Sequence, residues 1–396
     1  MIPEEPAERH RESPHLPLPT PRSLPVRIGP ITLNSPLCQA GLAGYSDRAM
    51  RNVARRRGCP YAVTEALLDT LMLAGGWGLK NAIDINKHDH PVAGQIIGSE
   101  PETMAAAARI LARHDYDVID LNFACPVKKI KNKSRGGHML RDVARGHSIV
   151  RAVREALPNA TLSVSLRRAF DDTPENRDAL FELVDEMWQQ GYASVRVHGR
   201  TVEQKYAGRA DWTILRQLKE RYPNNVIFGS GDVFTAQDVV RMKHETGVDV
   251  VWVARGAIGN PWIFRDAIKL LADPTIKLDP PTIAEQRDAL SEHFHEAMQI
   301  HGEGLAGRRM RKMGIKYARF HPQAREVKNA FIGVNGRREW QAVLDQFYAD
   351  EGPGEGSVEG AGERVGVWPE SDAVDEVNTE AKIPVSDGCG IDEPAV

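Results

Sequence analysis

Residues 226–256 read VIFGSGDVFTAQDVVRMKHETGVDVVWVARG and contain one complete strand–helix–strand unit. Its two ends, at 226–229 and 250–253, are short runs rich in Val and Ile, which are typical of buried strands. Between them apolar residues recur at helical spacing over 235–246, and Thr235 is placed as the helix N-cap. Because parallel strands need a crossover connection, the stretch predicts one β/α repeat.

The same alternation continues on the N-terminal side of this stretch. Six more strands are predicted, at 36–39, 61–64, 91–97, 118–122, 161–166 and 194–198. Helical patterns lie between them, at 103–113, 143–156, 176–190 and 213–221, with Asp211 as a further N-cap. Eight strands that alternate with helices predict an α/β fold, the (β/α)₈ or TIM barrel.

An open doubly wound sheet is the alternative fold. That fold usually carries the glycine pattern G-x-G-x-x-G after its first strand, where a helix N-terminus receives a pyrophosphate. Here the turn after the first strand reads AGLAGYSD, at residues 40–47. The sequence therefore favours the barrel.

The pattern changes after residue 280, where 282–300, 324–335 and 337–348 are predicted to be helices. Between them lies the basic segment GRRMRKMGIKYAR, at 307–319. Both chain ends are polar and rich in Pro, Gly and charge, and such segments cannot bury enough apolar surface to fold. We expect a disordered lead-in (1–25), a catalytic barrel (26–278), a helical domain (279–349) and a disordered acidic tail (350–396).

Composition narrows the class of protein. The chain has 396 residues, 41% of them hydrophobic, which allows one large core and a smaller domain. No apolar run reaches the roughly 18–20 residues that cross a bilayer, and no secretory signal is visible. We expect a cytoplasmic monomer without a membrane contact. The four cysteines form no C-x-x-C pair, so neither a metal site nor a disulfide framework is predicted.

The net charge of −3 is unevenly distributed. From residue 350 onward there are 13 Asp/Glu and 2 Lys/Arg, which leaves 49 Lys/Arg against 41 Asp/Glu in the rest of the chain. A basic body suits a polyanionic partner, whereas an ordinary solvated surface with an acidic tail gives the same counts. Charge alone leaves both interpretations open.

Unusual residues fall where predicted strands end, and the active site of a (β/α)₈ barrel lies at the C-terminal ends of its strands. Small residues after the first strand let a flat ligand approach the backbone. The amide of Gln95 can both donate and accept, as the C2=O/N3–H edge of a flavin ring requires. Gly231, Arg255 and Gly256 follow the last two strands, where barrels often bind phosphate. These features indicate a phosphorylated ligand such as FMN.

Cys125 differs from the other cysteines. Cys38 and Cys59 sit in or beside early strands, and we expect both to be buried core residues. Cys125 instead follows a strand end, precedes Pro126 and opens the basic loop VKKIKNKSRGG, at 127–137. Such a loop is either an active-site lid or an ordinary solvated loop.

Six motifs together resemble the bacterial tRNA-dihydrouridine synthase family. They are AGLAGYSDRAMR, GQIIGSEPE, DVIDLNFACPVKKI, VRVHGRTVEQKYAGRADW, SGDV and ARGAIGNPWIF, and the resemblance covers about residues 28–271. Weaker similarity continues to residue 347. The resemblance implies an FMN-dependent reduction of the C5–C6 double bond of uridine in tRNA to dihydrouridine, with NADPH or NADH as the reductant.

The resemblance also implies roles for individual residues. Cys125 is the general acid, which protonates C5 of uracil after a hydride reaches C6. RNA contacts are implied for Lys128, Lys129, Arg200, Arg311 and Lys312. Contacts with FMN are implied for Gly41, Leu42, Ala43, Gln95, Ser165, His198, Gly231, Asp232, Ala254 and Arg255.

Two positions depart from the family pattern. Family members usually have lysine at the position of Ser165 and asparagine at that of Ser230. The lysine stabilises the anionic reduced flavin, and Arg168 is a nearby cation that could replace it. Two alternative functions are a flavin barrel that acts on a free pyrimidine and an RNA-binding relative that has lost catalysis. The first would not need the basic helical segment.

Overall fold

The computed structural model describes residues 25–75, 83–126 and 135–356. The predicted roles of Lys128 and Lys129 lie outside these ranges, as do nearly all of the predicted N-terminal lead-in and most of the acidic tail.

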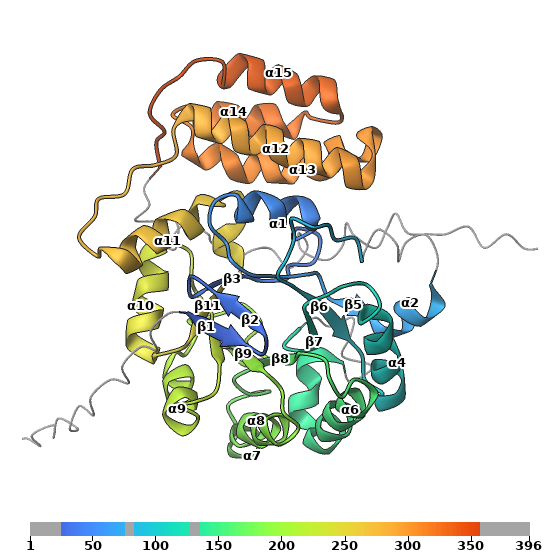
Figure 1. Ribbon diagram of the computed structural model, residues 1–396. Helices are drawn as coiled ribbons and strands as arrows, with labels where there is room; N and C mark the ends of the chain where they lie inside the picture. The colour runs from blue at the N-terminus through green and yellow to red at the C-terminus, as the bar shows by residue number, and fades with distance from the viewer. Residues whose placement is uncertain (1–24, 76–82, 127–134, 357–396) are drawn as a thin grey trace, which may run out of the picture.

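Eight parallel strands form a closed barrel, which confirms the predicted fold (Figure 1). Neighbouring strands pair in chain order, and the last strand pairs with the first, Val251 opposite Leu37. A ninth strand, β5 (Leu67–Leu68), adds to the edge of β6. Each predicted strand is present to within one or two residues: β3 (Leu37–Gln39), β4 (Ala62–Val63), β6 (Val92–Ile97), β7 (Val118–Phe123), β8 (Leu162–Arg167), β9 (Ser194–His198), β10 (Ile227–Ser230) and β11 (Val250–Val253).

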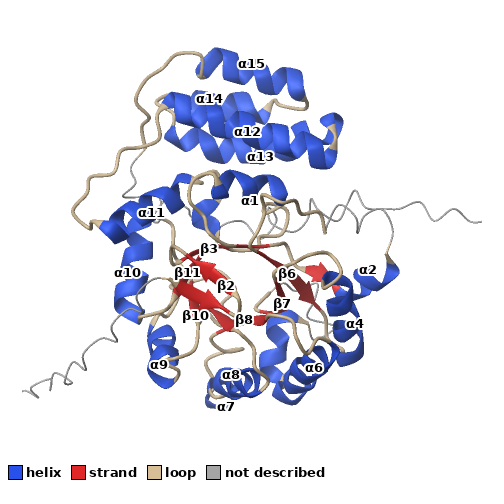
Figure 2. Cartoon of the chain, in the orientation of Figure 1, coloured by secondary structure: helices blue, strands red, loops and turns tan. Residues whose placement is uncertain are grey.

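Helices surround the barrel (Figure 2). Thr235 caps α10 in a capping box with Asp238. Asp211, predicted as the N-cap of α9, lies one residue before that position, which Trp212 occupies; its side chain still accepts the backbone N–H of Thr213 (2.9 Å), the first residue of the helix. The surrounding helices are α1 (Arg48–Arg55), α2 (Asp69–Ala74), α4 (Pro101–Leu111), α6 (Val143–Ala156), α7 (Pro174–Arg177), α8 (Ala179–Gln189), α9 (Thr213–Arg221), α10 (Ala236–Thr246) and α11 (Trp262–Ala272).

The single helix predicted at 176–190 is wrong in one respect, because the chain forms two helices there. The short helix α7 begins at Pro174, whose fixed φ suits a first helical turn. It ends at Arg177, and α8 then starts at Ala179.

An antiparallel hairpin that the sequence pattern did not predict closes the bottom of the barrel. It consists of β1 (Val26–Ile28) and β2 (Ile31–Leu33). Its apolar side chains share one buried cluster with the first inward-facing residues of the strands, among them Val118, Val226 and Val250. The N-terminal end of the barrel is therefore apolar, and polar groups inside it lie nearer the C-terminal ends of the strands.

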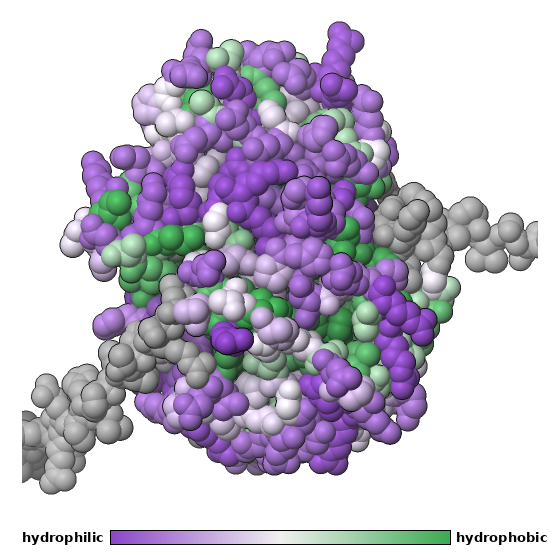
Figure 3. All heavy atoms as spheres, viewed as in Figure 1, coloured by the Kyte–Doolittle hydropathy of each residue, from purple (hydrophilic) through white to green (hydrophobic). Residues whose placement is uncertain are grey.

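In the described part of the chain four helices follow the barrel, where three were predicted after residue 280. They are α12 (Ile283–His301), α13 (Glu303–Tyr317), α14 (Ala324–Ile332) and α15 (Arg337–Phe347); the additional one is α13, and the basic segment lies in it. They stack in a layer above α1 and α11 (Figure 1). The outer surface of this layer is mostly hydrophilic on the face seen in Figure 3. Within the described ranges, no helix is long and apolar enough to span a bilayer.

Ion pairs and hydrogen bonds fasten the helical layer to α1. Glu296 accepts from Asn52 (3.1 Å) and Arg56 (2.8 Å). Glu292, one turn earlier on α12, accepts from Arg57. At the far end of α12, His301 Nε2 lies 2.8 Å from Asp47 Oδ2. Since α1 follows the first barrel strand, these contacts fix the helical layer relative to the strand ends.

The same interface buries His293, which should make the stability of the protein pH-dependent. Burial lowers the pKa of His293 from 6.5 to about 4, against the smaller opposing effect of Asp47. The unfolded chain binds a proton below pH 6.5 while the folded protein does not, so stability is lost as the pH falls. From pH 6.5 to 4 we expect a loss of about 3 kcal/mol in the free energy of unfolding from this residue. Denaturant titrations of the wild type and His293→Gln measure it. If the free energy of unfolding falls equally steeply with pH in the wild type and in the variant, the prediction is wrong.

Candidate active site

Residues that the sequence predicted for one site do meet at the C-terminal ends of the strands. Gln95 lies on β6, Ser165 on β8 and His198 on β9, and the register places Ser165 beside Arg196 and Arg167 beside His198. Gly231 and Asp232 follow β10, and Ala254 and Arg255 follow β11. Gly41, Leu42 and Ala43 follow β3 on the same side.

Two glycines in these turns leave no room for a side chain. A Cβ added to Gly41 would lie 2.1 Å from the carbonyl oxygen of Thr64, and one added to Gly256 would lie 2.4 Å from that of Val233. Gly231 adopts a φ of +121°, which side chains disfavour. Close packing of the protein's own backbone therefore requires glycine at positions 41 and 256, and the positive φ favours it at 231.

Gln95 is part of a buried polar network. Its Nε2 donates to Asp120 (2.7 Å), and its Oε1 accepts from Asn122 (2.7 Å). Ser165, at the position where the family usually has lysine, donates to the same carboxylate (2.8 Å). Arg168 does not supply the missing charge, because it pairs with Asp172 (2.6 Å). The other departure, Ser230, donates to the backbone carbonyl of Trp252 (2.9 Å).

A small hollow lies where the sequence predicted a phosphate. Its volume of about 20 Å³ holds roughly one water molecule. The buried indole N–H of Trp252 in its wall has no hydrogen-bond partner among the described residues, and Arg255 also lines it. Arg255 lies 3.5 Å from Asp232, which makes closer contacts with Arg200 (2.7 Å). A donor without a protein partner and a loosely paired cation fit the phosphate end of FMN.

A larger hollow, of about 530 Å³, lies outside the barrel at the junction of α1, α11 and α12. Its described lining carries charges of both signs, for example Arg57 and Glu292, and includes none of the predicted site residues. Its position away from the strand ends separates it from the candidate site.

His198 is neutral at physiological pH. Burial holds its pKa well below 6.5, and the nearby Arg167, Arg200 and Arg255 lower it further. Its Nδ1 accepts the backbone N–H of Arg200 (3.1 Å), so the ring proton is on Nε2. The ring can therefore donate one hydrogen bond to a ligand without carrying charge.

Cys125 stands just beyond β7 with its backbone held on two sides. Its N–H donates to Asn122 Oδ1 (2.9 Å), and its carbonyl accepts from Gly137 (3.0 Å). Arg167 donates to the carbonyl of Ala124 (2.9 Å) and interacts electrostatically with Cys125. Cys125 is partly exposed, whereas Cys38 and Cys59 are buried, as predicted.

Three predicted RNA contacts have protein partners. Arg200 is 3% exposed, and its guanidinium donates to Ala207 and Asp232. On α13, Arg311 donates to the carbonyl of Val334 (2.8 Å). The Lys312 ammonium lies 4.3 Å from the centre of the Tyr45 ring. Their roles in RNA binding stay predictions.

Two charged residues that the sequence analysis did not assign complete the interior of the site. Asp120 and Arg196 are fully buried and form an ion pair across β7 and β9. The sequence did contain a signal, because each is a charged residue at an inward-facing position of an otherwise apolar strand.

On α13, Arg308 and Arg309 are exposed. Within the described ranges no group of three or more His, Cys, Asp or Glu side chains could hold a metal ion.

The chain is similar to known proteins. The family model described as dihydrouridine synthase matches residues 38–351. A tRNA-dihydrouridine synthase B of Xanthomonas campestris pv. campestris is 31% identical over 330 residues, with 82% of this chain and 96% of that protein covered. The protein of the same name from Pseudomonas aeruginosa is 30% identical, with the same coverage.

Solved structures of similar shape include a histamine dehydrogenase from Rhizobium sp. 4-9, with a TM-score of 0.46 and 14% identity over 68% of this chain and 50% of that one. The family match covers both the barrel and the helical layer. The chain belongs to the dihydrouridine synthase family.

Proposed function

We propose that this protein is a tRNA-dihydrouridine synthase that uses FMN and NADPH or NADH, and that it acts as a cytoplasmic monomer. The observation that carries the proposal is the position of Cys125, which lies at the end of β7 and is linked through Asn122 to Gln95. This position supports a role for Cys125 as the proton donor beside the residues that we propose for the flavin. Family membership supports the reduction of uridine.

In the proposed reaction the cofactor supplies a hydride and the protein supplies a proton. When bound, the flavin supplies the hydride that adds to C6 of uracil. Cys125 Sγ gives its proton to C5, so the C5–C6 double bond becomes a single bond. Asn122 and Arg167 hold the peptide unit before Cys125, and Gly137 holds the one after it, which fixes the donor. Neutral His198 orients the ligand by one hydrogen bond, and Arg255 balances the phosphate.

The test is to map dihydrouridine in RNA from cells with and without the gene, and to record the visible spectrum of the purified protein. We expect a yellow protein and the loss of at least one dihydrouridine from tRNA. A yellow protein with unchanged tRNA would indicate a free pyrimidine as substrate. A colourless protein that binds tRNA would indicate a relative that has lost catalysis.

We propose that α13 contributes to tRNA binding and that Arg308 and Arg309 contact phosphates along with Arg311 and Lys312. A uracil in folded tRNA must be extruded to reach a barrel interior, so basic groups must hold the surrounding backbone. Arg308 and Arg309 are exposed. Arg311 and Lys312 are partly buried against other parts of the protein.

Removing both exposed charges, in Arg308→Ala with Arg309→Ala, should weaken tRNA binding and flatten its salt dependence. Each phosphate that is no longer neutralised reduces the slope of log K against log salt by about 0.7–0.9, so we expect a change of about 1.5. Binding measured at several salt concentrations gives the slope. The control is Arg109→Ala with Arg113→Ala, two exposed positions at α4 on the flank of the barrel. Equal slopes in both variants would show that α13 is not the RNA surface.

A further inference from the structure

The carboxylate of Asp120 is saturated with hydrogen-bond donors. Oδ1 accepts from Ser163 (2.6 Å) and from Arg196, and Oδ2 accepts from Ser165 (2.8 Å) and Gln95 (2.7 Å). Asp120 and Arg196 are 0% exposed, and Gln95 is 2% exposed. An ionised carboxylate has no proton to give, so each of these four partners must donate to it.

Arg196 forms an ion pair with this carboxylate inside the barrel. Its guanidinium also donates to Ser163 (2.6 Å) and to the hydroxyl of Tyr61 (2.7 Å), and it lies 4.8 Å from the centre of the Phe228 ring. A buried carboxylate is tolerated only when it is paired and hydrogen-bonded. The pair therefore has a fixed polarity, with the cation toward the closed end of the barrel and the second oxygen toward Gln95.

The orientation of the Asp120–Arg196 pair determines how the side-chain amides of Gln95 and Asn122 are oriented. Because Gln95 must turn its NH₂ group to Asp120, its oxygen faces away and accepts from Asn122 Nδ2 (2.7 Å). The oxygen of Asn122 is then left to accept the backbone N–H groups of Ala124 (3.0 Å) and Cys125 (2.9 Å). An amide side chain has nearly the same shape in both orientations, so hydrogen bonding alone selects one.

We infer that Asp120, anchored by Arg196, is a positioning residue: it sets the direction of the Gln95 and Asn122 amides and thereby holds the backbone of Cys125. The inference rests on the proposed function for its catalytic consequence, though not for its structural one. Asp120 touches none of the reacting atoms, and its effect is transmitted through the chain of hydrogen bonds.

Asp120→Asn tests the chain of bonds directly. Asparagine can donate as well as accept, so Gln95 is free to present its oxygen to position 120 and its NH₂ group to Asn122. Asn122 Nδ2 then loses its acceptor, and the side chain that holds the backbone of Ala124 and Cys125 is less firmly anchored. We expect backbone amide exchange at Ala124 and Cys125 to become roughly tenfold faster, the effect of losing one hydrogen bond. This measurement needs neither flavin nor tRNA, so it tests the inference even if the proposed function fails.

In the flavin-loaded enzyme the step that uses Cys125 should slow by roughly 10–100-fold, since misplacing a reacting group by about an ångström costs this much. Reduction of the flavin by NADPH should change less. A general loss of structure would slow both steps together, so the ratio of the two rates separates positioning from instability.

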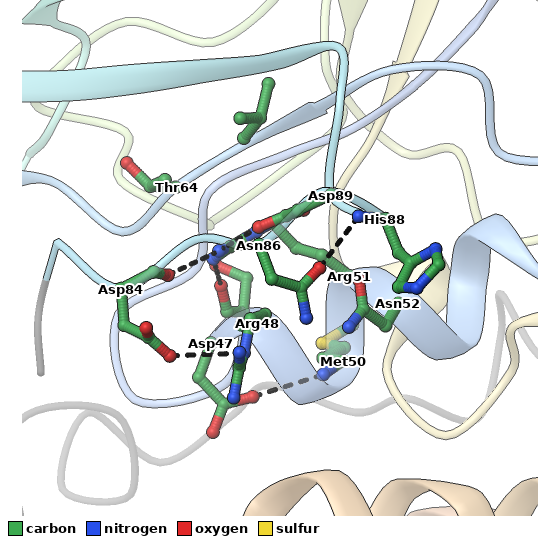
Figure 4. Close-up of polar contacts among 12 residues, drawn as sticks. Asp47, Arg48, Met50, Arg51, Asn52, Thr64, Asp84, Asn86, His88 and Asp89 are labelled. Atoms are coloured by element: carbon green, nitrogen blue, oxygen red, sulfur yellow. Dashed lines mark hydrogen bonds and ion pairs between the residues drawn. The ribbon is translucent and has the colours of Figure 1, made fainter. Parts of the chain in front are cut away.

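Arg51 and Asp89 provide a matched control, because they form another buried Arg–Asp pair. Asp89 accepts from Arg51 Nε (3.0 Å) and Nη2 (2.5 Å), and Figure 4 shows the two side chains facing each other beside α1. Asp89→Asn should lower stability without changing exchange at Cys125 or the ratio of the two rates.

Asp120→Asn leaves Arg196 without its anion and could prevent folding, so the double variant Asp120→Asn with Arg196→Met is the second test. It keeps the interior neutral and should show the same faster exchange and the same slow step. Unchanged exchange at Cys125 in a folded single or double variant would overturn the inference, as would an equal effect of Asp89→Asn.

Discussion

Replacing Cys125 by alanine is expected to slow oxidation of the reduced flavin by tRNA by roughly 10²–10⁴-fold, the usual contribution of a positioned general acid. The protein should still fold, because the thiol is only partly buried and the backbone contacts with Asn122 and Gly137 do not involve it. Flavin content and the rate of reduction by NADPH should stay normal. Stopped-flow absorbance separates the two half-reactions.

Cys59→Ala is the matched control. Cys59 is 3% exposed, its thiol donates to the carbonyl of Tyr61 (3.2 Å), and burial raises its pKa to about 11. Its replacement should cost about 1 kcal/mol of stability, as a small core truncation does, and leave both half-reactions unchanged. If Cys125→Ala oxidises with tRNA as fast as Cys59→Ala does, the proton comes from another group and Cys125 is not the acid.

The barrel could be predicted from sequence because most of its strands are short apolar runs between turns, several of them rich in Val and Ile, and they alternate with helical patterns. The hairpin of β1 and β2 could not. Its strands have three residues each, and their burial arises from contact with Val118 and Val250, far away in sequence. A pattern of three residues carries too little periodicity to distinguish strand from turn.

Site residues could be predicted from the sequence where one residue is unusual by itself. They could not be predicted where the function depends on two residues that only the fold brings together. Cys125 and Arg255 stand out at strand ends on their own. Asp120 and Arg196 are 76 positions apart, and only the closed barrel reveals that the two charges cancel. The sequence likewise shows that position 165 lacks a cation, whereas the register shows a buried one directly beside it, at Arg196.

Exposure was the other property that sequence could not assign. Arg200, Arg311 and Lys312 were predicted to bind RNA because they are basic residues in family motifs, yet each has a protein partner here. Arg308 and Arg309 belong to the same basic segment and face solvent. A run of basic residues on a helix necessarily places some toward the core, and their spacing alone does not say which unless the apolar face is clear.

Arg255 should decide whether the cofactor is bound by its phosphate. It opens a short 3₁₀ turn after β11 and is flanked by the rings of Phe234 (5.0 Å) and Tyr206 (5.2 Å), which restrict where its guanidinium can lie. Burial and the neighbouring Arg200 lower its pKa, and Asp232 opposes this shift only in part. A dianionic phosphate would relieve that cost, so the site favours an anion.

Arg255→Ala should therefore weaken FMN binding by roughly 10–100-fold, since a hydrogen bond to a charged group contributes about 1.5–3 kcal/mol. Riboflavin, which lacks the phosphate, should bind the variant and the wild type equally well, because the ring contacts that we propose do not involve Arg255. Titrating both ligands into both proteins gives the four affinities of a double-mutant cycle. The coupling energy from that cycle measures the interaction between Arg255 and the phosphate. Arg168→Ala is the control: that arginine also follows a strand end but pairs with Asp172, and its replacement should move neither affinity. Equal weakening of FMN and riboflavin in Arg255→Ala would mean that the residue supports the fold or the ring, and that the phosphate is held elsewhere.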